Sequence, residues 1–231
     1  MKNEVFSVGV DLGNGFTNYL SQRNDGKGQR FATKVKQVAE FPFLENKRSE
    51  IHRVEIGNQK FIVGEGVTLE IKDVKQRINS RDYKVALLTA IAKSLPRAGY
   101  AEVNVCVGLP INRLQKFADE LETIIRSLES TEFIVDNERY EIVINDVQVF
   151  AEGALSVIKD LNGKVLTIDM GSGTVDCISF EDNEPVETLT VPTSMNDIYT
   201  NVADRLNTQF GMSITTDMVE NYIGKETIKY N

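Results

Sequence analysis

The sequence predicts an α/β protein of two similar lobes that face each other across a cleft, with a small insert in the first lobe. Two observations lead to this fold class. A strand–turn–strand unit at Phe6–Leu20 recurs at Val165–Phe180, and the segments around both units alternate between strand-like and helix-like patterns. We place the first lobe at residues 1–164, its insert at about 31–75, and the second lobe at residues 165–231.

The two repeated units carry the same residue types at the same spacing. The corresponding pairs are Asp11 and Asp169, Gly13 and Gly171, and Gly15 and Gly173. The apolar runs before the aspartates predict strands buried on both faces, and the glycines predict tight hairpins with positive φ. Such a turn can hold phosphate oxygens, while the aspartate can hold a hydrated Mg²⁺. One copy alone would read as an ordinary hairpin, but two copies in the same context favour a phosphate site.

Length and composition limit the possible functions. A chain of 231 residues, 41% hydrophobic and 26% charged, is typical of a soluble globular protein with a substantial core. The net charge of −8 argues against general binding of nucleic acid. Cys106 and Cys177 lie in apolar runs, which predicts buried reduced thiols, and a single histidine, His52, expected on the surface, argues against zinc and histidine chemistry. With no signal peptide or membrane span evident, we expect a cytoplasmic protein.

In order along the chain, the first lobe begins with a three-stranded meander at residues 4–36. The insert is less regular and contains one strand pair, Val54–Gly57 and Gln59–Val63. Ser80 is expected to cap a helix at Arg81–Leu95, whose apolar residues recur at helical spacing.

The remaining elements follow from the same signals. Strands are expected at Val103–Leu109, Thr131–Asp136, Arg139–Asn145 and Pro185–Val191, and helices at 112–128 with Asn112 as N-cap, at 151–158, from Ser194 to about Gln209, and after Thr215 or Thr216. The apolar stripes of these helices are interpreted as core packing, with no role in binding a ligand.

These residues resemble the actin-like ATPase superfamily, which includes actin, bacterial actin-like filament proteins, seventy-kilodalton heat-shock chaperones and sugar kinases. Asp11–Gly15 resembles the first phosphate motif and Asp169–Asp176 the second, while Phe150–Ala154 resembles the connecting segment with the catalytic carboxylate. Val107–Pro110 and Val63–Glu65 are most similar to plasmid-partition actins of the ParM and AlfA type. The resemblance covers nearly the whole chain and implies two actin-like (ribonuclease H-like) lobes with a nucleotide cleft between them.

The resemblance implies that ATP and Mg²⁺ bind in this cleft. The nucleotide-binding residues would be Asp11, Gly13, Asn14, Gly15 and Phe16 on one side, and Gly171, Ser172, Gly173 and Thr174 on the other. Asp11 and Asp169 would hold Mg²⁺ through water, and Asp169 would also act in catalysis. Glu152 would orient the attacking water or pass on its proton; the alternative is an exposed glutamate at a helix start. Asp176 is either part of the site or a structural hydrogen-bond acceptor.

Two departures from the family pattern qualify the expectation. Many actins have a lysine seven residues after the first aspartate, where this chain has Asn18. Family members also continue with a long helix and a glycine-rich adenosine motif beyond the point that corresponds to Asn231. The second lobe is therefore expected to be incomplete, in a fragment or in a reduced protein, and the affinity for nucleotide to be lowered.

The leading hypothesis is an ATPase that assembles with copies of itself into nucleotide-dependent filaments. Such filaments would segregate plasmid or phage DNA through a DNA-binding adaptor protein, with no direct contact to nucleic acid or membrane. A non-polymerising kinase of the same fold, which phosphorylates a small acceptor, is the alternative. A binding module that has lost hydrolysis is a third reading, distinguished by nucleotide binding without release of phosphate.

Overall fold

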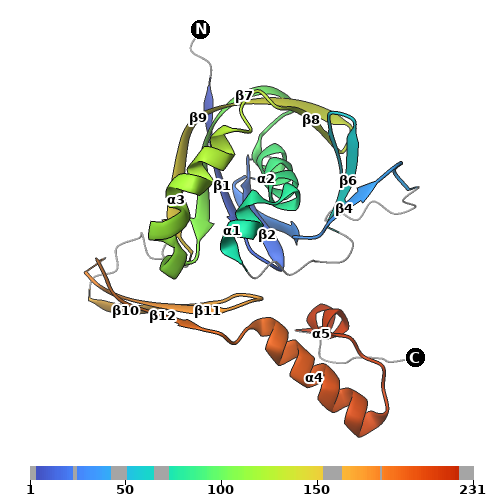
Figure 1. Cartoon of the computed structure of the whole chain (residues 1–231), viewed down its shortest axis with the longest axis vertical. Coiled ribbons are helices and arrows are strands. Elements are labelled where there is room, and N and C mark those ends of the chain that lie inside the picture. Colours follow the sequence, from blue (N-terminus) through green and yellow to red (C-terminus); the bar gives the residue numbers. More distant parts are fainter. Residues whose placement is uncertain are drawn as a thin grey trace.

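The computed structural model describes residues 4–22, 25–42, 51–64, 73–152, 163–182 and 184–223. The chain has a mixed α/β fold with two sheets (Figure 1). The larger, in the N-terminal part, has nine strands in the order β3-β2-β1-β7-β9-β8-β5-β6-β4, and the smaller, in the C-terminal part, has three in the order β10-β11-β12. The C-terminal part is thus less than a second full lobe.

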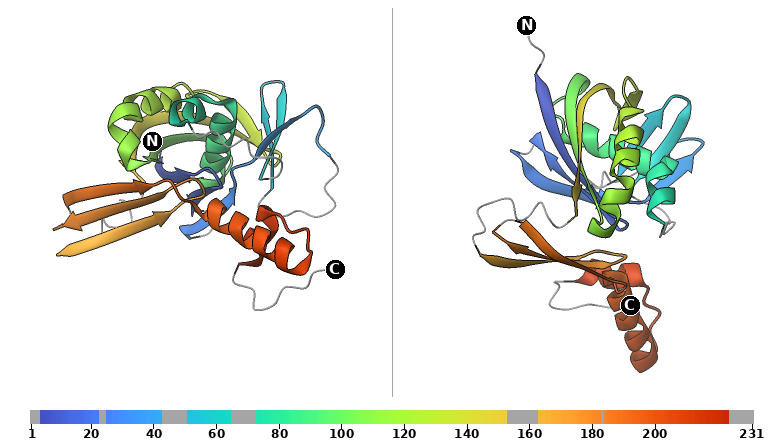
Figure 2. Two further views of the ribbon diagram at one scale, coloured as in Figure 1. Left: turned by 60° about the horizontal axis from the view of Figure 1, so that its bottom comes forward. Right: turned by 60° about the vertical axis from the view of Figure 1, so that its left-hand side comes forward.

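The N-terminal part contains the elements β1 (Val5–Leu12), β2 (Phe16–Ser21), β3 (Lys27–Ala32), β4 (Val35–Val38), β5 (His52–Ile56), β6 (Gln59–Val63), α1 (Val74–Asn79), α2 (Arg81–Ser94), β7 (Gly99–Leu109), α3 (Ile111–Arg126), β8 (Glu132–Val135) and β9 (Glu138–Ala151). The C-terminal part contains β10 (Lys164–Met170), β11 (Val175–Glu181), β12 (Glu184–Val191), α4 (Met195–Phe210) and α5 (Thr216–Tyr222). The small sheet lies beneath the end of the N-terminal part where α1 is found (Figures 1 and 2).

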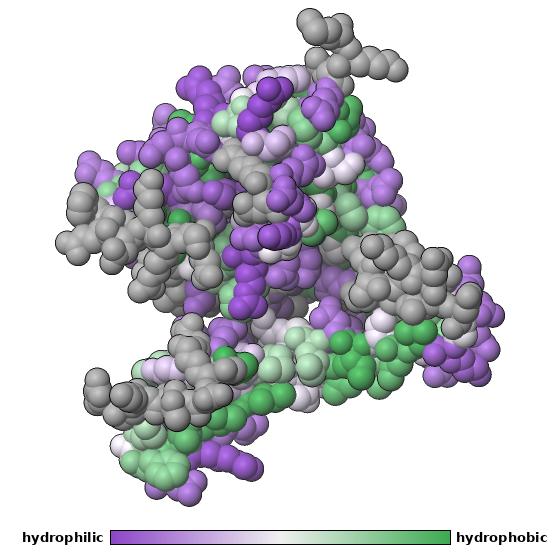
Figure 3. Space-filling model, turned by 180° about the vertical axis from the view of Figure 1, so that it is seen from behind, coloured by the Kyte–Doolittle hydropathy of each residue, from purple (hydrophilic) through white to green (hydrophobic). Residues whose placement is uncertain are grey.

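The prediction that the strand before the second aspartate is buried on both faces is wrong. Leu166, Ile168 and Met170 of β10 are 60%, 58% and 62% exposed. The reason is that β10 pairs only with β11 and that, within the described ranges, no helix packs over this face of the small sheet. Hydrophobic side chains accordingly gather on the surface of the C-terminal part (Figure 3).

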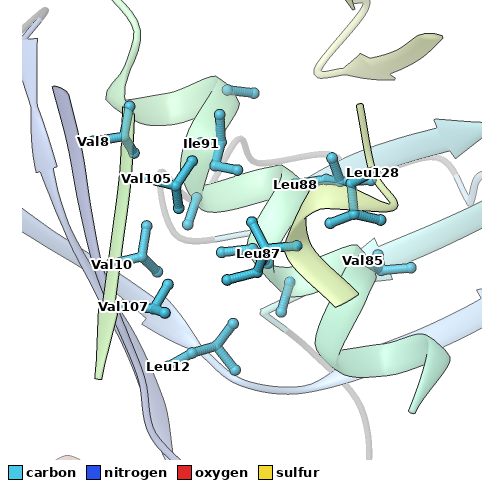
Figure 4. Packing of buried hydrophobic residues seen from close by; sticks show 14 of the residues in the cluster. Val8, Val10, Leu12, Val85, Leu87, Leu88, Ile91, Val105, Val107 and Leu128 are labelled. Carbon is cyan, nitrogen blue, oxygen red and sulfur yellow. The ribbon is translucent and has the colours of Figure 1, made fainter. Parts of the chain in front are cut away.

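The strand before the first aspartate has a different environment. Val8, Val10 and Leu12 of β1 are buried beneath α2, where they pack with Leu87 and Ile91 (Figure 4). Strand β1 also has two neighbours, antiparallel β2 and parallel β7. The core of the N-terminal part therefore lies between the central strands of the sheet and α2, and it holds the first hairpin in place.

Two of the three predicted helix caps are confirmed. The Ser80 hydroxyl accepts a hydrogen bond from the Tyr83 N–H at the start of α2, and Ser194 forms a capping box with Asp197 at the start of α4. Asn112 as a cap is wrong, because α3 begins directly after Pro110, whose carbonyl accepts the first N–H groups of the helix. The short helix α5 is confirmed, with Thr215 as its N-cap.

The strand pair predicted in the insert is present as β5 and β6. Strand β5 also pairs with β8, with Val54 opposite Val135, so that these strands continue the large sheet. Whether residues 31–75 fold as a separate subdomain stays a prediction. The six-residue helix α1 was not predicted. Of the helix expected at 151–158, Ala151 ends β9 and residues 153–158 lie outside the described part.

The expectation that His52 lies on the surface is wrong, because its side chain is only 2% exposed. At the start of β5 the ring faces the core, packs edge-on against Phe31, and has its Nδ1 2.8 Å from an Asp136 carboxylate oxygen. Cys106 and Cys177 are both free thiols but only half-buried. No helix in the described ranges has the length and hydrophobicity that a membrane span requires.

Candidate functional site

A cavity of about 470 Å³ lies between the N-terminal and C-terminal parts. Asp11 of β1, Glu152 after β9 and Asp169 of β10 all line it. The other lining residues are Gly9, Val10, Asn18, Tyr19, Leu20, Gly28, Cys106, Gly108, Thr167 and Ile168. The three carboxylates assigned to one site from the sequence therefore surround one cavity, although they come from β1, from β10 and from the residue that follows β9.

The two repeated motifs form the same hairpin. In the first, the Gly13 N–H donates to the Phe16 carbonyl at 3.0 Å, and in the second the Gly171 N–H donates to the Thr174 carbonyl at 2.9 Å. Asp11 lies opposite Asn18 in one ladder, as Asp169 lies opposite Asp176 in the other. The shared spacing of residues thus produces a shared backbone geometry.

The positive φ predicted for the hairpin glycines is wrong, and these glycines instead permit close approach between the two loops. None of the four hairpin glycines has φ in the left-handed region. A Cβ at Gly15 would overlap the Ser172 hydroxyl, and a Cβ at Gly173 would lie 2.9 Å from the Asn14 amide nitrogen. The two loops therefore lie face to face, with Gly15 next to Ser172 and Gly173 next to Asn14.

Asn18 stands where the family pattern often has lysine. Its side-chain amide donates to an Asp11 carboxylate oxygen at 2.9 Å across the hairpin. The donor is a neutral amide, so Asn18 holds the Asp11 carboxylate in place without supplying the positive charge that a lysine would bring.

Of the two interpretations of Asp176, the structure supports the structural one. Its buried carboxylate accepts hydrogen bonds from Thr174 at 3.1 Å and Thr190 at 2.5 Å. The Thr190 hydroxyl in turn accepts from the Asn112 amide of α3 at 3.0 Å. This chain of hydrogen bonds connects the second hairpin to α3 of the N-terminal part. The Asn112 side chain therefore bonds to Thr190 and does not cap α3.

Glu152 is enclosed by the end of the large sheet. Its backbone N–H donates to the Leu109 carbonyl at 2.8 Å, and its Cγ packs so closely on Gly108 that a Cβ there would lie 2.9 Å away. The side chain is 16% exposed, so it is not the exposed glutamate of the alternative reading. Burial, opposed by Arg77 and reinforced by nearby aspartates, raises the pKa of Glu152 to about 8. A carboxyl with this pKa can exchange a proton near neutral pH.

The site concentrates negative charge. Burial, followed by the charges of Asp11 and Asp176, raises the pKa of Asp169. No set of three or more possible metal ligands occurs in the ranges that the structure describes. Two carboxylates on opposite sides of a cavity nevertheless fit Mg²⁺, which commonly keeps several waters and takes the rest of its ligands from phosphates.

Two residues at the site were missed from the sequence. Arg77 of α1 donates from Nη1 to the Asn14 side-chain oxygen at 3.0 Å, and its Nη2 lies 4.0 Å from Glu152 Oε1. Tyr83 of α2 is buried near these groups. Burial raises the pKa of its hydroxyl, and the charges of Arg77, Glu152 and Asp11 also act on that pKa. No short motif marks either residue, and the caps Asp73 and Ser80 were the only local signals for the α1–α2 corner.

Residues 9–154 match the family model described as "Actin like proteins N terminal domain". The chain belongs to this actin-like family. No match was found among the curated proteins. With its actin-like N-terminal domain the chain is similar to the archaeal actin homolog Ta0583, with a TM-score of 0.74 and 18% identity over 96% of this chain and 73% of that one.

Similar structures also include ParM proteins. The apo psk41 ParM protein has a TM-score of 0.69 and 18% identity, with 94% of this chain and 73% of that chain covered. A ParM filament from Clostridium botulinum has a TM-score of 0.73 and 20% identity, with 100% and 76% covered. At these identities the similarity shows the actin-like fold alone.

Helix α4 is attached to the second hairpin, because its Met195 N–H donates a hydrogen bond to the Gly171 carbonyl at 3.0 Å.

Proposed function

We propose that the chain binds ATP and Mg²⁺ in a cleft between two actin-like lobes, hydrolyses the ATP and assembles with copies of itself into nucleotide-dependent filaments. The first lobe would comprise residues 1–164 and the second, incomplete, residues 165–231. The observation that carries this proposal is the pair of matching hairpins, Gly13–Phe16 and Gly171–Thr174, which meet beside a cavity lined by three carboxylates.

Each part of the site has a role in this proposal. The backbone of the two hairpin loops binds phosphate oxygens from opposite sides. Mg²⁺, held by Asp11 and Asp169 through water, supplies positive charge that neutralises the phosphates. Glu152 orients the attacking water and, in its ionised form, accepts its proton at Oε1, an atom that has no hydrogen-bond partner in the described part of the chain. Positioning and neutralisation of charge then account for most of the catalysis.

Assembly into filaments is proposed from the relatives. The similar structures of Alp12, and of AlfA from B. subtilis plasmid pLS32, are filament structures. By analogy with the plasmid-encoded AlfA, we propose a cytoplasmic role in DNA segregation. The net charge of −8 favours attachment to DNA through a basic adaptor over direct contact.

High-speed pelleting with ADP, ATP or a slowly hydrolysed ATP analogue, together with measured release of phosphate, tests the proposal. We expect the protein to pellet with ATP and with the analogue, and to release phosphate only from ATP. A matched Glu152→Gln variant is expected to pellet with ATP but to release phosphate at least a hundredfold more slowly. Protein that stays soluble with all three nucleotides yet transfers phosphate to a small acceptor would favour the kinase alternative.

A further inference from the structure

Buried polar atoms without partners occur on Glu152, which lines the cavity, and on two residues that interact with it, Arg77 and Tyr83. In the part of the chain that the structure describes, the buried side-chain atoms without a hydrogen bond are His52 Nε2, Arg77 Nε, Tyr83 Oη and Glu152 Oε1. The last three belong to residues that interact electrostatically with one another. Because native proteins leave few buried polar groups unpaired, three in one place indicate a site for a polar ligand.

The guanidinium group of Arg77 joins two parts of the proposed site. Its Nη1 binds Asn14 in the first hairpin loop, and its Nη2 is 4.0 Å from Glu152 Oε1, too far for a hydrogen bond. The side chain is 12% exposed. A guanidinium group has five N–H donors arranged to bind two oxygens at once, which suits a phosphate. Most of this capacity is therefore available to a ligand that lies between the loop and Glu152.

We propose that Arg77 binds the terminal phosphate of the nucleoside triphosphate, so that a residue of α1 distinguishes the triphosphate from the diphosphate. This inference rests on the proposed function, which places the phosphates between the two hairpins. The phosphate that is attacked must then lie next to the water held by Glu152, and Arg77 is the cation between Glu152 and the first loop. In this arrangement the Tyr83 hydroxyl, which is buried and has no hydrogen-bond partner in the described part of the chain, positions this water.

The contact has a mechanical consequence for the α1–α2 corner. The Arg77 carbonyl accepts hydrogen bonds from the Ser80 hydroxyl at 2.7 Å and from the Ser80 N–H at 3.0 Å. The same Ser80 hydroxyl caps α2 by accepting the Tyr83 N–H at 3.1 Å. A terminal phosphate held by Arg77 would thus order α1 against the start of α2, and loss of that phosphate would release this constraint.

The test compares the affinities of the full chain for ADP and for a slowly hydrolysed ATP analogue, by titration calorimetry in the presence of Mg²⁺. Arg77→Gln is expected to weaken binding of the analogue about 10- to 100-fold, the value of a charge-assisted hydrogen bond, and to change ADP affinity less than threefold. Arg77→Lys keeps the charge but not the fork, so its loss should be intermediate. Arg81→Gln is the control, because Arg81 pairs with Asp82 and Gln37 on the surface.

Each other outcome would overturn the inference in a recognisable way. Equal losses for ADP and the analogue would mean that Arg77 only orders the first loop through Asn14. Unchanged affinity for both would exclude contact with phosphate. A wild-type chain that binds neither nucleotide would refute the proposed function itself, and this inference with it. If Arg77→Gln does not fold by circular dichroism, Arg77→Lys decides, since a loss confined to the analogue is still required.

Discussion

Replacement of Glu152 by glutamine is expected to stabilise the nucleotide-free chain at alkaline pH while it slows ATP hydrolysis. The side chain is 16% exposed, and burial raises its pKa from 4.5 to about 8. Arg77 opposes this increase, and the charges of Asp11 and Asp169 add to it. Glutamine has the shape of the protonated carboxyl group but cannot ionise. The variant is thus held in the form that the folded state prefers.

The magnitude follows from the two pKa values. Because the pKa of Glu152 is higher in the folded state, the unfolded chain has already released this proton at pH values where the folded chain retains it. The free energy of unfolding of the wild type must therefore fall as the pH rises from about 4.5 to about 8. At about 1.4 kcal/mol per pH unit, this one group lowers stability by at most about 5 kcal/mol over that range. Above pH 8 the effect is constant.

Urea unfolding followed by circular dichroism between pH 5 and pH 8.5, without nucleotide and with a chelator, measures the effect. Other groups also titrate, so the informative quantity is the difference between Glu152→Gln and the wild type. This difference should be near zero at pH 5 and grow to several kcal/mol in favour of the variant at pH 8.5. Glu141→Gln is the control, since Glu141 is exposed on β9, the strand that precedes Glu152, and this substitution should give no such trend.

Equal stability of Glu152→Gln and the wild type at pH 8.5 would refute the reasoning, because it would show that Glu152 ionises in the folded state without cost. The release of phosphate is a separate readout. A variant that is stabilised at pH 8.5 but still hydrolyses ATP at the wild-type rate would uphold the burial argument and remove Glu152 from catalysis.

Two further variants test other contacts. Burial would raise the pKa of Asp136, but the hydrogen bond and charge of His52, with Arg53 and Lys93, lower it to about 2. Asparagine tolerates the positive φ of 54° at this position. Asp136→Asn should lower the free energy of unfolding in urea by about 1–2 kcal/mol at pH 7. This difference from the wild type should shrink as the pH falls from about 4 towards 2, and a difference that stays constant would contradict the reasoning. Gly15→Ala should weaken nucleotide binding at least about tenfold, because the added Cβ overlaps the Ser172 hydroxyl; unchanged affinity in titration calorimetry would contradict this.

The hairpins could be predicted because their information is local. The order of aspartate, apolar residue and glycine determines where each strand ends and how it turns, and both copies give the same hydrogen bond across the turn. What failed was the reason for the glycines. A requirement for positive φ belongs to one hairpin, but the close approach of Gly15 to Ser172 depends on residues far apart in sequence, which a local pattern cannot show.

Burial of β1 and β10, the two strands that carry the repeated aspartates, illustrates the same limit. Leu12 and Met170 follow the two aspartates in identical positions, yet Leu12 is buried and Met170 is 62% exposed. An apolar run predicts which residues can be buried, whereas actual burial requires an element that packs on them. Helix α2 covers β1, and nothing in the described part of the chain covers the corresponding face of β10. His52 shows the converse, since Asp136 and Phe31 enclose a residue that looked solvent-exposed.

The part of the site that sequence reasoning missed is the part without a counterpart in the repeat. The phosphate loops occur twice, so each supports the interpretation of the other. Arg77 and Tyr83 both come from the N-terminal part, and α1, which carries Arg77, is too short to show helical periodicity. In the proposed function the repeated loops bind the phosphates from both sides, whereas Arg77 contacts the terminal phosphate from the N-terminal part alone. This asymmetry explains why the predicted site contained anionic groups and backbone donors but not the cation that faces them.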